Sequence, residues 1–164
     1  MARIRAEHPA WTRSRTTSQS WCNTIVGLGG VVLSMAWVNR SLVAQFYFES
    51  PDADLNQARF DWLHDRRNAF EAALGTTAVW DAMAGRKGAR IMVMSPFDDI
   101  EDVDRWPAMT TWLIEQQIRL REALAKVGGA PLCGMSSRTE SVKRRDGEPI
   151  QGNAFRRPRD CFRS

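Results

Sequence analysis

The sequence has few of the residues that stabilise small secreted proteins or build metal centres. Its three cysteines, Cys22, Cys133 and Cys161, are an odd number without a Cys-x-x-Cys pair, and its only histidines are His8 and His64. A disulfide framework or a zinc site needs paired or clustered ligands. This scarcity argues against both, and we expect neither a metal ion nor a cofactor.

Long apolar segments are also absent. The longest nearly apolar run, residues 25–38, has 14 residues and includes three glycines and a serine, whereas a membrane-spanning helix needs about 20. The N-terminus is rich in arginine and lacks the apolar region of a signal peptide. We therefore expect a cytoplasmic protein without a membrane segment.

The 164 residues suffice for one domain. The net charge of +4 is unevenly distributed, because residues 1–20 carry +3, residues 128–164 carry +4 and residues 21–127 carry −3. A nucleic-acid-binding domain usually shows a basic footprint on its folded part. The charge pattern therefore gives no sign of such a footprint, and places the basic residues in the two ends.

The middle of the chain opens with three short segments in which apolar and polar residues alternate. This alternation predicts strands over residues 21–26, 31–38 and 41–49. Glycines dominate the first connection, at residues 27–30, and Asn39-Arg40 allows a tight reversal at the second. Consecutive strands with short links predict an antiparallel meander.

Two helices and a hairpin are predicted after the meander. One helix is expected over residues 54–74, after Asp52 as its capping residue. A hairpin with strands at 79–84 and 89–94 follows, and Pro107 opens the second helix, as proline does at a first helical position.

We therefore predict an α+β fold in the order βββαββα, with an antiparallel sheet and two helices packed on one face. Trp80 and Ile91 are expected to pack on this sheet against the helices. The folded unit is expected at 21–127, after a polar lead-in over 1–20. Residues 128–164 lose the periodicity and are basic, which predicts a disordered tail.

Two segments resemble known ligand sites but depart from their patterns. Residues 27–30 contain three glycines, yet Val32 stands where a dinucleotide loop has its last glycine, and a strand follows instead of a helix. The acidic segment 98–104 could collect a divalent cation, but an EF-hand counted from Asp98 needs glycine and glutamate where Val103 and Met109 stand. Neither segment predicts a site.

No catalytic constellation is apparent either. Nucleases of the PD-(D/E)xK type need an acid two residues before a strand lysine. The residues at that spacing from the three lysines are Gly85, Leu124 and Ser141. His64 could act as a general base, but no nucleophile is paired with it in the sequence. We therefore expect no enzymatic activity and assign no catalytic residue.

Two basic clusters lie inside the domain, on either side of Trp80 in the sequence, and together they could form one small patch. It would suit a small nucleic-acid or phosphate contact, although a solvated helix face and a charged hairpin tip explain it equally well. Its members are Arg66, Arg67, Arg86, Lys87 and Arg90.

A family resemblance covers residues 21–127 and is clearest from residue 56 onward. The pattern comprises Phe60-Asp61, Phe70-Glu71-Ala72-Ala73-Leu74-Gly75, Trp80-Asp81, Arg86-Lys87, Ala89-Arg90-Ile91, the acids from Asp98 to Asp104, Arg105-Trp106-Pro107 and Trp112-Leu113. In these features the chain resembles the bacterial and archaeal domain of unknown function 4268.

The resemblance implies a fold and little about activity. Members look like the C-terminal part of longer proteins, some with a nuclease-like region upstream. The resemblance also implies a helix before the first strand, which we do not expect residues 1–20 to supply, and residues 130–164 match nothing in the family. A truncated or frameshifted reading frame would explain both ends.

Our functional hypothesis is a non-catalytic accessory domain of a bacterial nuclease or defence-type protein, which interacts with a protein partner or an upstream nuclease-like domain. The alternative is a DNA-binding or nuclease-associated fragment whose basic ends contact phosphates without sequence preference, so that binding weakens steeply with salt. A third hypothesis is a small metal-dependent enzyme that uses the acids of 98–104.

Overall fold

Five strands form one antiparallel sheet in the computed structural model, which describes residues 2–12, 20–129 and 132. Its order is β1-β2-β3-β5-β4, so the opening meander pairs with the later hairpin through β5. This confirms the predicted α+β fold. The strands are β1 (Trp21–Ile25), β2 (Val31–Val38), β3 (Ser41–Phe48), β4 (Val79–Asp81) and β5 (Ala89–Met94).

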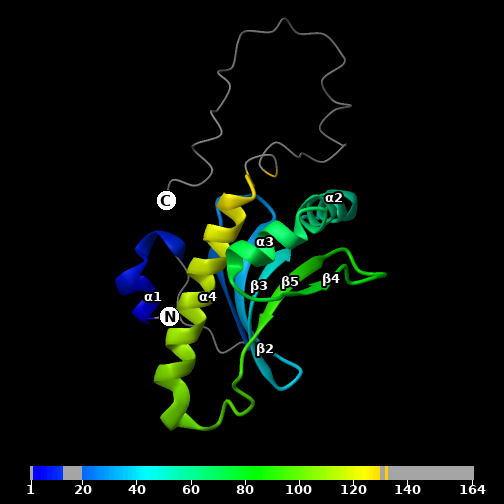
Figure 1. Cartoon of the computed structure of the whole chain (residues 1–164). Helices are drawn as coiled ribbons and strands as arrows, with labels where there is room; N and C mark the ends of the chain where they lie inside the picture. The colour runs from blue at the N-terminus through cyan, green and yellow to red at the C-terminus, as the bar shows by residue number, and fades with distance from the viewer. Residues whose placement is uncertain (1, 13–19, 130–131, 133–164) are drawn as a thin grey trace, which may run out of the picture.

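Helices α2 (Ala53–His64), α3 (Arg67–Leu74) and α4 (Trp106–Lys126) all pack on one face of the sheet (Figure 1). The single helix predicted over 54–74 is therefore wrong in one respect, because the chain leaves helical geometry at Arg66, with φ −108° and ψ 16°. The apolar residues keep a helical spacing across this break, so the sequence carries no sign of it. They are Phe60, Leu63, Phe70 and Leu74.

The N-terminal segment contains a short helix, α1 (Ala2–Glu7), and a 3-10 turn, η1 (Pro9–Trp11). The expectation that no helix precedes the first strand is wrong. Ile4 is 2% exposed and packs with Met35 and Ile114, while the rest of α1 is exposed. One buried residue gives no amphipathic stripe, so sequence periodicity could not reveal this helix.

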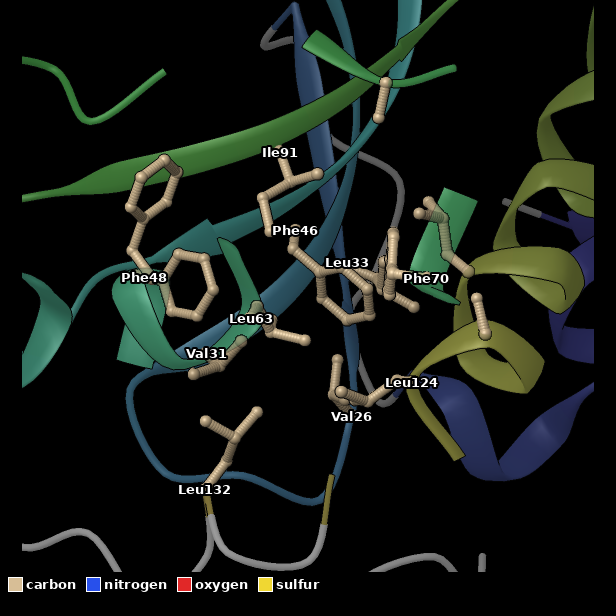
Figure 2. Packing of buried hydrophobic residues seen from close by; sticks show 14 of the residues in the cluster. Val26, Val31, Leu33, Phe46, Phe48, Leu63, Phe70, Ile91, Leu124 and Leu132 are labelled. Atoms are coloured by element: carbon tan, nitrogen blue, oxygen red, sulfur yellow. The ribbon is translucent and has the colours of Figure 1, made fainter. Parts of the chain in front are cut away.

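The main core lies between the sheet and the three helices (Figure 2). Ile91 is fully buried there, and Trp80 lies beside it on β4, with its ring packed edgewise against Phe60 and Phe70. The predicted packing of Trp80 and Ile91 is therefore confirmed. Leu132 is 1% exposed and belongs to the same cluster.

The helix cap and the tight turn that were predicted from neighbouring residues are both present in the structure. The carboxylate of Asp52 accepts hydrogen bonds from the backbone N–H of Asp54 (3.0 Å) and Leu55 (3.2 Å) and so caps α2. Asn39 and Arg40 both have positive φ, 49° and 62°, as a two-residue hairpin requires. The disorder predicted for 128–164 concerns residues that, apart from 128, 129 and 132, lie outside the described part of the chain.

Candidate binding surfaces

The two arginines at the junction of α2 and α3 are engaged within the domain. Arg66 places its guanidinium 4.0 Å from the centroid of the Trp62 ring and donates from Nη1 to the Trp62 carbonyl oxygen at 2.8 Å. Arg67 pairs through Nε with Oε1 of Glu71 at 3.0 Å. Both guanidinium groups therefore already have partners within the domain.

The hairpin contributes the other three predicted cations. Arg90 donates from Nε to Oδ2 of Asp81 at 2.8 Å. A hydrogen bond from the Met83 backbone N–H, opposed by burial and assisted by Arg90 and Arg86, lowers the pKa of the Asp81 carboxyl. Arg86 and Lys87 are exposed at the turn. Of the five cations, Arg66, Arg86 and Lys87 form no ion pair among the described residues, and Arg66 is held by Trp62 instead.

Asn56 fixes this turn to α2. It is 1% exposed, and its Nδ2 donates to the backbone oxygens of Lys87 and Ser50, both at 2.8 Å. Its Oδ1 accepts from the Ser50 N–H at 2.9 Å. The hairpin tip that carries Arg86 and Lys87 is therefore anchored to the helix layer through its backbone.

Trp80 is not a free stacking platform. Its Nε1 donates to Oε1 of Glu71 at 2.8 Å, and the ring of His64 lies edgewise at 5.5 Å between centroids. Glu71 Oε1 also accepts from the Ala78 backbone N–H at 3.1 Å and from Arg67. Burial opposes ionisation of the Glu71 carboxyl, but these donors outweigh it, and its pKa is lowered.

This network makes the stability of the domain sensitive to acid. A carboxyl whose pKa is lower in the folded state stabilises the fold above its unfolded pKa of about 4.3, and this stabilisation is lost as pH falls through the folded pKa. Glutamine does not titrate, so Glu71→Gln should lack the stabilisation that the ionised carboxyl loses in acid. We therefore expect its free energy of unfolding to fall less between pH 7 and pH 3 than that of the wild type. Urea unfolding at several pH values measures it. The exposed Glu122→Gln is the control, and identical profiles for Glu71→Gln and the wild type would contradict the role of Glu71.

An unexpected surface lies between β5 and α4. Here three large apolar side chains are exposed: Ile100 by 38%, Val103 by 60% and Trp106 by 52%. We call residues 98–106 the apolar loop. In the sequence it is an acidic segment, and its charge gave no indication of exposed apolar side chains.

The apolar loop is held by its own contacts. Trp106 Nε1 donates to the Ile100 carbonyl oxygen at 2.7 Å, and Asp98 pairs with Arg105 at 3.5 Å. Val103–Arg105 form a 3-10 turn, η2. These contacts tie the ring of Trp106 to the backbone at Ile100. Within the described ranges, no three His, Cys, Asp or Glu side chains gather where they could hold a metal ion.

Comparisons with known proteins identify one family. A family model described as a domain of unknown function (DUF4268) matches residues 2–128. This match includes α1, whereas the sequence resemblance was placed over 21–127. The chain has no match among curated proteins or among solved structures. In the part that the structure describes, no helix is long and apolar enough to cross a bilayer.

Proposed function

This chain belongs to the family described as a domain of unknown function (DUF4268), and we propose that it acts there as a non-catalytic interaction domain that docks onto a protein through its apolar loop. The observation that carries the proposal is the exposure of Ile100, Val103 and Trp106 in a loop where the Trp106 ring is hydrogen-bonded to the Ile100 backbone. Clustered exposed apolar side chains mark interaction sites in soluble proteins. A large aromatic such as Trp106 is the kind of residue that dominates binding energy.

The charges of the apolar loop indicate what its partner offers. Five acids alternate along the chain with the three apolar residues, and one of them, Asp98, is paired with Arg105; they are Asp98, Asp99, Glu101, Asp102 and Asp104. Complementary charges steer partners and set their orientation. The partner is therefore a protein surface with an apolar pocket and a basic rim. In our proposal it belongs to a nuclease-like or defence-type protein, as an upstream domain or a separate chain.

The double variant Val103→Ser/Trp106→Ala tests this docking. The flanking reading frames are where our proposal places the nuclease-like partner, and we expect the double variant to weaken binding to such a protein about tenfold or more, since the loss of one anchoring side chain typically costs over 1 kcal/mol. The two proteins are co-expressed and then separated, and isothermal titration calorimetry measures the dissociation constant of the complex that they form. Val79→Ser is the matched control, because Val79 is also exposed, by 45%, but lies on β4. The proposal would be contradicted if the wild-type protein did not bind the partner, or if the double variant bound it as tightly as the wild type.

Phosphate contact is the second candidate function. It is supported by Arg86 and Lys87, which are exposed on a hairpin tip that Asn56 anchors. The two candidates respond differently to salt. Phosphate contacts weaken steeply as salt rises, because binding releases counterions, whereas docking through Val103 and Trp106 weakens less, because only its charged rim depends on salt.

A further inference from the structure

The face of the sheet opposite the helices carries a polar row at its centre. The strand register pairs Asn23 of β1 with Ser34 of β2, and Ser34 with Gln45 of β3. Side chains alternate between faces along a strand, so these three lie opposite Leu33 and Phe46, which the helices cover. A trough of about 350 Å³ lies over this row.

Gln45 is the unusual member of this row. It is 6% exposed and lines the trough, and its Oε1 is buried without a hydrogen-bond partner among the described residues. A buried acceptor without a donor destabilises a fold, and an apolar side chain of the same size would avoid that cost. The unused acceptor therefore points to a donor that comes from a ligand.

Aromatic side chains flank the polar row on both sides. On the same face, the next row along the strands on one side holds Trp21, which pairs with Ala36. The next row on the other side holds Tyr47, which pairs with Val32. Residues on the same face of a strand are about 7 Å apart along it, so a single ring fits over Ser34 and Gln45 between them. Trp21 is 47% exposed and lines the trough, which leaves its ring available for stacking.

The one charged side chain that lines the trough among the described residues limits the charge of a ligand that could bind there. Glu49 follows β3 and lines the trough, with its side chain exposed. Its carboxylate accepts hydrogen bonds from N–H or O–H groups and repels anions. The trough thus combines neutral amide and hydroxyl groups, an available aromatic face and one carboxylate.

We propose that the trough binds a neutral ring compound that lies against Trp21 and donates an N–H or O–H hydrogen bond to Oε1 of Gln45. Nucleobases and pyranose sugars share this chemistry. This binding site lies on the opposite face of the sheet from the helix layer and is independent of docking through the apolar loop.

Titration of the full-length protein distinguishes the two sources of this chemistry. One arm uses adenosine and cytidine, and the other uses glucose and N-acetylglucosamine, with binding followed by calorimetry. We expect one arm to saturate with a dissociation constant of about 1 mM or tighter, as a good ligand of this size allows. No saturation in either arm would overturn the proposal.

Two variants then test the residues. Gln45→Met keeps the volume but removes the acceptor, so we expect binding about tenfold weaker, together with a melting temperature equal to the wild type or higher by about 2–4 °C. Trp21→Ala should also weaken binding about tenfold, while Gln57→Met, at an exposed position on α2, should leave it unchanged. A Gln45→Met protein that melts lower than the wild type would show a structural role for the amide and overturn the assignment.

Discussion

Replacing Trp80 by alanine is expected to lower the free energy of unfolding by about 2–3 kcal/mol, less than the roughly 3–5 kcal/mol for a fully buried aromatic side chain, because the Trp80 ring is half-buried at the edge of the core. The ring packs edgewise against Phe60 and Phe70, with centroids 6.0 and 5.6 Å away. Its loss would also remove one of the three hydrogen-bond donors to Glu71 Oε1. Urea unfolding followed by circular dichroism measures the change without relying on tryptophan emission.

Two further variants locate the origin of that loss. Trp80→Phe keeps most of the ring contacts but leaves Glu71 without the indole N–H, and should cost about 1–2 kcal/mol. Trp106→Ala, which removes a 52% exposed ring, should cost less than about 1 kcal/mol. If Trp80→Ala also costs less than about 1 kcal/mol, the ring is exposed in solution, and a role in stacking on nucleic-acid bases would gain support.

The second large effect is expected at Leu132, beyond the end predicted for the domain. Leu132 is 1% exposed, and Figure 2 shows it on the side of the core where Val26 and Val31 lie. Its backbone N–H donates to the Gly129 carbonyl oxygen at 3.1 Å. Leu132→Ala should therefore lower the free energy of unfolding by about 2–4 kcal/mol, as for other buried leucines.

Limited proteolysis gives an independent measurement at the same place. A resistant fragment should retain Leu132 in the wild type. Ile100→Ala is the control for the point variant, because Ile100 is 38% exposed and its truncation should cost less than about 1 kcal/mol. A stable core that ends at residues 127–130, together with a neutral Leu132→Ala, would show that Leu132 does not contribute to the fold.

The sequence was informative where structure depends on neighbours along the chain. β2 has the bounds that alternation predicted, residues 31–38, and Asn39-Arg40 forms the predicted reversal. Asp52 caps α2, and α4 begins beside Pro107. Each of these features arises from backbone preferences and hydrogen bonds within a few residues, so the local sequence contains the necessary signal.

The candidate sites were predicted less well, because their state depends on distant partners. The sequence grouped five cations, but only the fold shows that Glu71 engages Arg67 and that Asp81 engages Arg90. The exposure of Val103 likewise depends on how the loop leaves β5. Composition identifies a basic cluster or an acidic segment, whereas burial and pairing decide which of its side chains remain available.

The sequence by itself determined the class of the fold, the order of its strands along the chain and the turn between β2 and β3, whereas β4 ends at Asp81, before the end predicted at residue 84. Only the tertiary structure decided that α1 packs through Ile4, that the first long helix breaks at Arg66, and that Leu132 joins the core. It also decided that Asn23, Ser34 and Gln45 form one row. These outcomes rest on register and packing between segments far apart in the chain, and local alternation and turn preferences do not specify such contacts.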